Sequence, residues 1–182
     1  MRIAGGRDKG RRIKVSRKGI RPTKALVREA IFDIIGTKIY DAEILDIFAG
    51  SGALGLEAIS RGAKRCVFVE KNPKILLQNI QNFSLMNNTE VIKSDFRAGC
   101  RRVKDKQFDV IFLDPPYNKN YVQKTIKLIS HYNLLKENGV IVAEHSEKEE
   151  FDVPENLLQI KKRVYGDTAV TFIGIKNSEV NI

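Results

Sequence analysis

The chain has 182 residues, of which 42% are hydrophobic and 30% are charged, and its formal net charge is +10. This length suits one domain with a full core, and no apolar run approaches the roughly 18 residues that a membrane-spanning helix needs. The N-terminus lacks the apolar stretch of a secretory signal, so we expect a cytoplasmic protein. Two cysteines provide neither a disulfide framework nor a zinc-ligand spacing, and we expect no bound metal.

The excess positive charge is concentrated in the first 24 residues. They hold ten basic side chains and one acid, Asp8, whereas the other 158 residues carry 22 basic and 21 acidic groups. Ile3 and Ile13 alternate with basic neighbours on either side of several glycines, which predicts a two-stranded hairpin. We therefore predict a basic N-terminal hairpin arm over residues 1–22 that binds a polyanion, followed by one domain over residues 23–182.

A helix is predicted directly after the arm. Arg21 precedes a proline and so disfavours helical backbone, and Thr23 is a suitable N-cap. Apolar residues then recur at helical spacing as far as Gly36, a residue that favours helix termination. The expected helix spans residues 24–35.

From residue 44 onward, short apolar runs alternate with helical segments. The expected strands are 44–48, 66–70, 91–93, 110–113 and 140–143, and the expected helices are 53–61, 73–86 and 119–131. Apolar strands that are each followed by a helix form a parallel sheet covered on both faces. Two final strands, 158–165 and 168–176, are joined by a two-residue turn and predict an antiparallel hairpin. The sequence thus predicts an α/β fold with a mostly parallel sheet.

A glycine-rich turn links the first strand of this domain to its helix. Gly50, Gly52 and Gly55 form a G-x-G-x-x-G pattern, and Glu70 follows Gly50 by twenty residues, at the end of the next strand. Glycines let a ligand approach the backbone, and the carboxylate can accept bonds from ribose hydroxyls, so the pattern fits nicotinamide dinucleotides as well as other nucleosides. Asp46, on the preceding strand, favours a ligand with an ammonium group over one with a pyrophosphate.

An Asp-Pro-Pro-Tyr segment follows the strand at 110–113, at the sheet edge where open α/β sheets bind ligands. Its two prolines fix an extended chain and remove two backbone donors. Asp114 and the carbonyl of Pro115 can accept both hydrogens of a planar exocyclic amine, while Tyr117 can stack on the base that carries it. The segment therefore indicates a site for a nucleobase amine.

A further acid, Asp95, follows the strand at 91–93. Its carboxylate can accept a bond from an adenine amino group, with Phe96 packing on the ring. A solvated loop aspartate explains the residue equally well.

The chain resembles class I S-adenosylmethionine-dependent methyltransferases that modify amino groups. The features that carry this resemblance are, in chain order, the glycine turn, Glu70, Asp95 and Asp-Pro-Pro-Tyr. The chain is more closely similar to the RsmD family of 16S ribosomal RNA guanine-N2 methyltransferases. The matching segments are residues 2–6, 19–23, 27–32, 45–58, 60–63, 68–70, 112–117 and 165–168. This resemblance implies a Rossmann-like, seven-stranded sheet with an antiparallel last strand.

The resemblance also implies a set of functional residues. S-adenosylmethionine is expected to bind at Asp46, Phe48, Gly50, Ser51, Gly52, Glu70, Asp95 and Phe96. Asp114, Pro115 and Tyr117 are expected to hold the target guanine for catalysis. RNA is expected to contact Arg2, Arg7, Lys9, Arg11, Arg12, Lys14, Arg21, Thr23 and Arg28. The expected partner is 16S rRNA within the small ribosomal subunit, bound by a monomer.

Three other functions remain compatible with parts of the sequence. Asp-Pro-Pro-Tyr serves the N6 amine of adenine in RNA or DNA as well as the N2 amine of guanine. The glycine pattern alone fits a nicotinamide-dependent oxidoreductase, although Asp46 and the absence of room for a second substrate domain count against it. A non-catalytic RNA-binding module is disfavoured by the intact acidic and aromatic positions.

Overall fold

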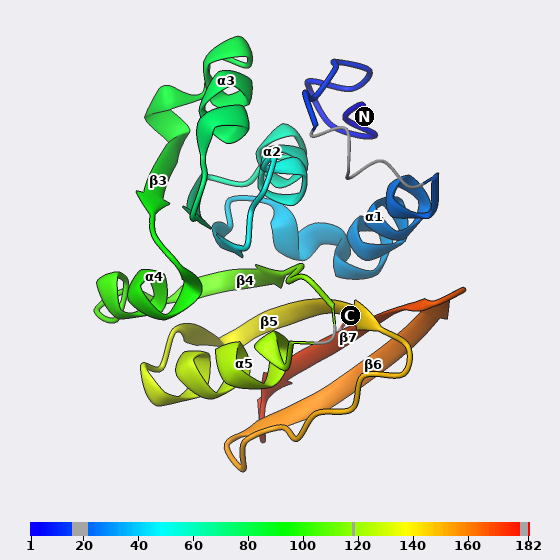
Figure 1. The fold of residues 1–182 in the computed structure, drawn as a ribbon, viewed down its shortest axis with the longest axis vertical. Coiled ribbons are helices and arrows are strands. Elements are labelled where there is room, and N and C mark those ends of the chain that lie inside the picture. The colour runs from blue at the N-terminus through cyan, green and yellow to red at the C-terminus, as the bar shows by residue number, and fades with distance from the viewer. Residues whose placement is uncertain (16–21, 118, 179–181) are drawn as a thin grey trace.

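The structure is a computed structural model that describes residues 1–15, 22–117, 119–178 and 182. A seven-stranded sheet with the order β3-β2-β1-β4-β5-β7-β6 forms its centre (Figure 1). The strands are β1 (Glu43–Ile47), β2 (Arg65–Glu70), β3 (Thr89–Lys93), β4 (Phe108–Leu113), β5 (Leu135–Ser146), β6 (Leu157–Tyr165) and β7 (Thr168–Ile175). Neighbours from β3 to β5 pair in parallel, whereas β7 is antiparallel to both β5 and β6. This confirms the predicted α/β sheet with an antiparallel last strand.

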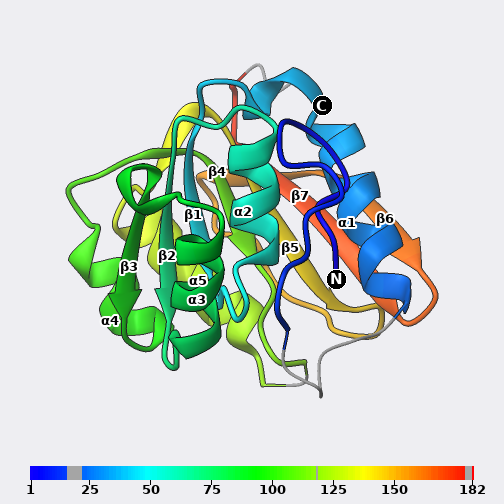
Figure 2. The same ribbon diagram turned by 90° about the horizontal axis from the view of Figure 1, so that it is seen from above.

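Helices cover both faces of the sheet (Figure 2). They are α1 (Pro22–Ile35), α2 (Ala53–Ser60), α3 (Lys74–Asn82), α4 (Phe96–Arg102) and α5 (Tyr121–His131), with short 3₁₀ segments at Gly36–Ile39 and Met86–Asn88. Successive strand residues point to opposite faces. Phe112 and Val142 accordingly pack in one core with α1, α2 and α3, while Leu113 and Ala143 pack in a second core with α4 and α5.

Several element boundaries differ from the predictions. Thr23 lies inside α1, which begins at Pro22, so the predicted N-cap at Thr23 is wrong. Proline is tolerated in the first helical turn, where its missing N–H has no intrahelical partner. The short helix α4 is absent from the elements that the sequence predicts. None of the helices among the described residues is long and apolar enough to cross a membrane.

The N-terminal segment, residues 1–15, packs on the domain instead of projecting from it (Figure 2). Its two halves pair in an antiparallel manner through the Arg2–Arg12 bridge, but they form no longer ladder within these residues. Ile3 and Ile13 are 2% and 3% exposed in the core that contains α1 and α2. Residues 16–20 of the predicted hairpin lie outside the described residues.

One buried carboxylate holds this segment to the domain. Glu57 of α2 is fully buried, and its two oxygens accept the backbone N–H groups of Ala4 and Gly5 at 2.9 and 2.8 Å. The same carboxylate accepts a bond from Arg61 Nε at 2.9 Å and lies 3.4 Å from Arg28 Nε. Burial of a carboxylate is tolerated when charged and polar groups satisfy it in this way.

Candidate active site

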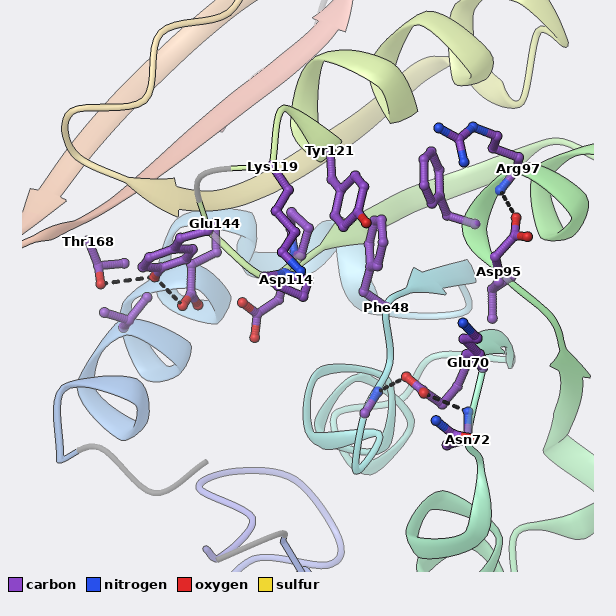
Figure 3. A pocket seen from close by; sticks show the side chains of 18 of the residues that line it. Phe48, Glu70, Asn72, Asp95, Arg97, Asp114, Lys119, Tyr121, Glu144 and Thr168 are labelled. Atoms are coloured by element: carbon purple, nitrogen blue, oxygen red, sulfur yellow. Dashed lines mark hydrogen bonds between the residues drawn. The ribbon is translucent and has the colours of Figure 1, made fainter. Parts of the chain in front are cut away.

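A cleft of about 960 Å³ opens at the carboxyl ends of the parallel strands (Figure 3). It lies where the chain order of the sheet reverses between β1 and β4, the usual position for a ligand in an open α/β sheet. Its walls include Phe48 after β1, Glu70 at the end of β2, Asp95 after β3 and Asp114 after β4. Four of the predicted site residues are therefore brought together by the strand ends.

The glycine turn shapes one wall of this cleft. Gly50 and Gly52 have φ values of 55° and 79°, a backbone region in which side chains are strained. A Cβ atom on Gly52 would also lie 2.4 Å from Leu76 Cδ1. Gly50 lines the cleft, whereas Ser51 and Gly52 are not on its wall. Of the three predicted contacts in this turn, only Gly50 therefore lines the cleft.

Glu70 is held in place by the backbone around it. Its Oε2 accepts the N–H of Gly50 and its Oε1 accepts the N–H of Asn72, both at 2.8 Å (Figure 3). Each carboxylate oxygen has more than one acceptor position, so these bonds orient the group and leave capacity for ligand hydroxyls.

Asp46 lies behind the cleft wall, in contrast to its predicted contact with a ligand ammonium group. It is 2% exposed, and its Oδ2 accepts the N–H of Gly55 in α2 at 3.1 Å. The side chain lies on the same face of β1 as that of Ile44, which packs in the core with α2, and so it points toward α2 instead of into the cleft. Burial raises the pKa of Asp46 to about 8, and the charges of Asp114 and Glu70 contribute in the same direction. The side chain thus connects β1 to α2.

Replacement of Asp46 by asparagine is expected to remove a pH dependence of stability. Between its ordinary pKa of 3.8 and its folded pKa of about 8, the folded state retains a proton that the unfolded state loses. The free energy of unfolding therefore falls as pH rises, by at most about 1.4 kcal/mol per pH unit. Urea unfolding at pH 5 and pH 7.5 should show a smaller decrease for Asp46→Asn than for the wild type. Equal decreases in the two proteins would contradict the assignment to Asp46.

Asp95 is the N-cap of α4 and lines the cleft. Its Oδ1 accepts the N–H groups of Arg97 and Ala98 at 2.8 and 3.1 Å, and the bond from Ala98 is the main cause of a lowered pKa. The carboxylate is therefore held in place by the helix. Neither interpretation of Asp95 from the sequence, as an acceptor for the adenine amine or as a solvated loop residue, included this capping role. The capping role is compatible with a ligand contact because only Oδ1 takes part in it.

Three aromatic rings form a cluster beside Asp95. Phe48 lies with its ring centroid 5.2 Å from that of Phe96 and 5.8 Å from that of Tyr121, on which it stacks. All three residues line the cleft. Such a surface offers an apolar wall for a planar ring, with Asp95 at its edge.

The Asp-Pro-Pro-Tyr segment also lines the cleft, as its position after β4 predicts. Asp114 and Tyr117 are half-buried, and Tyr117 Oη donates to Glu144 Oε1 at 3.0 Å and lies 3.1 Å from Thr168 Oγ1. Burial, and then the charge of Glu144, raise the pKa of Tyr117 above its ordinary value of 10, so the phenol stays protonated as a donor. Glu144 and Thr168, from β5 and β7, are cleft residues that the sequence reasoning missed.

The basic residues expected to contact RNA have different environments. Six are exposed on the N-terminal segment: Arg2, Arg7, Lys9, Arg11, Arg12 and Lys14. Arg28, in contrast, is 4% exposed, and its Nη2 donates to the carbonyl of Arg2 at 2.5 Å. It is therefore inaccessible to RNA and serves the packing of the segment. Arg21 lies outside the described residues, and the side chain of Thr23 is not described.

No group of three or more His, Cys, Asp or Glu side chains among the described residues is arranged to hold a metal ion. The cleft is instead lined by carboxylates, aromatic rings and a few basic side chains.

A family model described as conserved hypothetical protein 95 matches residues 1–174. The chain belongs to this family. The ribosomal RNA small subunit methyltransferases D of Escherichia coli K12 and Haemophilus influenzae are 34% and 35% identical to it. The alignments cover 93% and 91% of this chain and 87% and 89% of those proteins. The predicted RsmD family resemblance is thus confirmed, and the nicotinamide-dependent alternative is not supported.

Solved structures agree with this family assignment. The structure of yhhF from Escherichia coli has a TM-score of 0.87 and 32% identity, and the match covers 97% of this chain and 98% of that one. SMU.776, solved in complex with S-adenosylhomocysteine, has a TM-score of 0.68 at 19% identity, over 86% of this chain and 50% of that one. The second match shows a shared fold only.

Proposed function

We propose that the protein methylates the exocyclic N2 amine of a guanine in 16S ribosomal RNA, with S-adenosylmethionine as the methyl donor. The observation that carries this proposal is the cleft, which is lined by Asp114 of the Asp-Pro-Pro-Tyr segment together with Gly50 and Glu70. This arrangement occurs in a chain whose relatives are named ribosomal RNA small subunit methyltransferases.

The residues of the cleft suit an adenosine with a positively charged sulfur. Glu70 offers acceptors for ribose hydroxyls, and the ring cluster of Phe48, Phe96 and Tyr121 offers an apolar wall for the base. Asp95, at the edge of that wall, can accept from the adenine amine. When bound, the cofactor supplies an electrophilic methyl group on its sulfonium. Asp46 supports this site from behind by its bond to α2.

The Asp-Pro-Pro-Tyr segment is proposed to hold the target base after it has left its stack. An exocyclic amine is a poor nucleophile because its lone pair is delocalised into the ring. Asp114 and the carbonyl of Pro115 would accept its two hydrogens, which favours a pyramidal nitrogen and directs the lone pair toward the methyl group. Tyr117 would stack on the base. Catalysis would then come mainly from orientation and electrostatics.

The exposed basic side chains of the N-terminal segment are proposed to bind RNA phosphates. Deletion of the segment would not test this role, because Ile3 and Ile13 belong to the core. A triple variant, Lys9→Gln, Arg12→Gln and Lys14→Gln, changes only exposed side chains and retains the backbone bonds of residue 14 to Asn79. We expect the slope of log K against log salt to become shallower by about 0.7–0.9 for each RNA phosphate that the variant no longer neutralises.

The matched control removes three exposed lysines elsewhere: Lys104→Gln, Lys127→Gln and Lys148→Gln. Filter binding to 16S rRNA from about 50 to 200 mM salt should show a steep, unaltered slope for this control. If both triple variants shift the slope equally, the segment has no special role and only the overall charge matters.

Methyl transfer from labelled S-adenosylmethionine to naked 16S rRNA and to assembled small subunits tests the function itself. Nucleoside analysis of the product should show N2-methylguanosine, and we expect the assembled subunit to be the better substrate. N6-methyladenosine in its place would establish the adenine alternative. Absence of any RNA methylation would refute the proposal.

A further inference from the structure

Glu144 is a carboxylate beside Asp114 that has no role in the function proposed above. It lies in β5, is 6% exposed and lines the cleft. Leu113 of β4 pairs with Ala143 of β5 in the parallel register, so Asp114 and Glu144 occupy the next positions on neighbouring strands. Neighbouring strands are about 4.8 Å apart, which places the two residues side by side.

Both side chains emerge on the same face of the sheet. Phe112 and Val142, two positions earlier on each strand, pack in the core with α1, α2 and α3. Because side chains two residues apart point to the same face, Asp114 and Glu144 continue these two rows beyond the end of the core. Figure 3 shows both carboxylates directed into the same part of the cleft.

The orientation of Glu144 is tied to the Asp-Pro-Pro-Tyr segment. Tyr117 Oη donates to its Oε1 at 3.0 Å and lies 3.1 Å from Thr168 Oγ1, on the strand that pairs with β5 on its other side. A carboxylate offers about four acceptor positions, so the bond from Tyr117 fixes the group and retains capacity for a ligand donor.

Two neighbouring carboxylates match one purine better than the other. In guanine, the N2 amine lies next to N1–H, so the edge presents adjacent donors. In adenine, the N6 amine lies next to an unprotonated N1, whose lone pair would face the second carboxylate. Guanine therefore places a donor against the second carboxylate, whereas adenine places a lone pair there, and the two like-signed groups repel each other.

We propose that Glu144 determines the specificity for guanine by accepting the N1–H of the target base while Asp114 holds its N2 amine. This inference rests on the proposed function. It assigns to the cleft a base-selecting residue in addition to the Asp-Pro-Pro-Tyr segment, which does not by itself distinguish guanine from adenine.

The test uses small subunits whose 16S rRNA carries either guanine or 2-aminopurine at the methylated position, located first by mass spectrometry. 2-Aminopurine retains the amine but has an acceptor at N1. We expect the wild type to prefer guanine by about 10- to 100-fold in kcat/KM. Glu144→Gln should abolish most of this preference, because its amide can donate to N1 of 2-aminopurine but cannot accept from guanine N1–H as strongly.

Tyr117→Phe is the matched control, since it removes the bond to Glu144 but leaves the carboxylate in the cleft. We expect this variant to keep the preference for guanine even if it is slower. If Glu144 only holds Tyr117, both variants will slow the two substrates alike and keep the wild-type preference, which overturns the proposal. The Kd for S-adenosylmethionine, measured by calorimetry, should stay within about twofold in both variants.

The result also separates this inference from the function on which it rests. A wild type that forms no N2-methylguanosine contradicts the proposed function. A wild type that forms N2-methylguanosine but uses 2-aminopurine equally well contradicts only the assignment to Glu144. A preference that disappears in Glu144→Gln and persists in Tyr117→Phe supports both.

Discussion

Replacement of Asp114 by alanine is expected to lower kcat for methyl transfer by at least about 10²-fold, while the Kd for S-adenosylmethionine changes by less than about threefold. Asp114 is proposed to hold the target amine, whereas the cofactor is proposed to contact Glu70 and the aromatic cluster, which also line the cleft. Its removal would therefore eliminate an interaction with the reacting group without changing Glu70 or the aromatic cluster. Single-turnover methylation of small subunits and calorimetric titration of the cofactor measure the two quantities separately.

Glu70→Ala should mainly weaken the binding of S-adenosylmethionine, in contrast to Asp114→Ala, which should mainly lower kcat. Its carboxylate orients Gly50 and Asn72 and is proposed to bind the ribose, so cofactor affinity should fall by about tenfold or more. Asp105→Ala, an exposed acid outside the cleft, serves as the control and should leave both quantities unchanged. Full activity of Asp114→Ala, or unchanged cofactor affinity of Glu70→Ala, would remove that residue from the proposed site.

Replacement of Glu57 by alanine is expected to lower the free energy of unfolding by about 3–5 kcal/mol. Its buried carboxylate accepts the N–H groups of Ala4 and Gly5 and compensates the charges of Arg28 and Arg61. Without it, two backbone donors and Arg61 Nε lose their acceptor, and the buried guanidinium of Arg28 loses its ion-pair partner. Denaturant unfolding should show the decrease, and the thermal midpoint should fall by roughly 10 °C.

The effect should appear first at the N-terminal segment. Limited trypsin digestion of Glu57→Ala is expected to cleave within residues 1–15 under conditions in which the wild type is resistant. Glu57→Gln tests the charge, because it has nearly the same shape but cannot accept from all three donors and carries no charge to compensate Arg28. Glu155→Gln, an exposed acid, is the control and should change stability by less than about 0.5 kcal/mol. A stable Glu57→Ala protein would show that the segment is held by its other contacts, which are the burial of Ile3 and Ile13 and the hydrogen bonds to Ser60 and Asn79.

The cleft residues that could be predicted from the sequence are those that lie in a recognisable local sequence pattern. Gly50 lies in a glycine turn, Asp114 precedes two prolines, and Glu70 ends an apolar strand. Each pattern reflects a local requirement of the backbone, such as the positive φ of Gly50. Local patterns also place the strands, because apolar runs in a parallel sheet are continuous.

Other residues depend on contacts between distant segments. Asp46 and Arg28 are polar residues whose burial follows from the packing of α2 and the N-terminal segment, and no nearby residue signals it. Glu144 gains its role from the register of β4 with β5. One signal was available for it, since it is an acid directly after the apolar run at 140–143, at the ligand-binding edge of the sheet. Similarly, Asp95 before α4 has the residue type of an N-cap, which could have indicated that helix.

The position of β7 has a consequence for how the protein folds as it is synthesised. β7 is synthesised after β5 and β6, yet it lies between them in the sheet. Until residues 168–175 leave the ribosome, β5 is an open edge with an apolar surface, and β6 has no neighbour with which to pair in the final sheet. Val170 and Ile173 each belong to one of the two cores, so both cores are completed together. The nascent chain therefore exposes an aggregation-prone edge until β7 has been synthesised, and the part of the cleft that Thr168 lines forms only then.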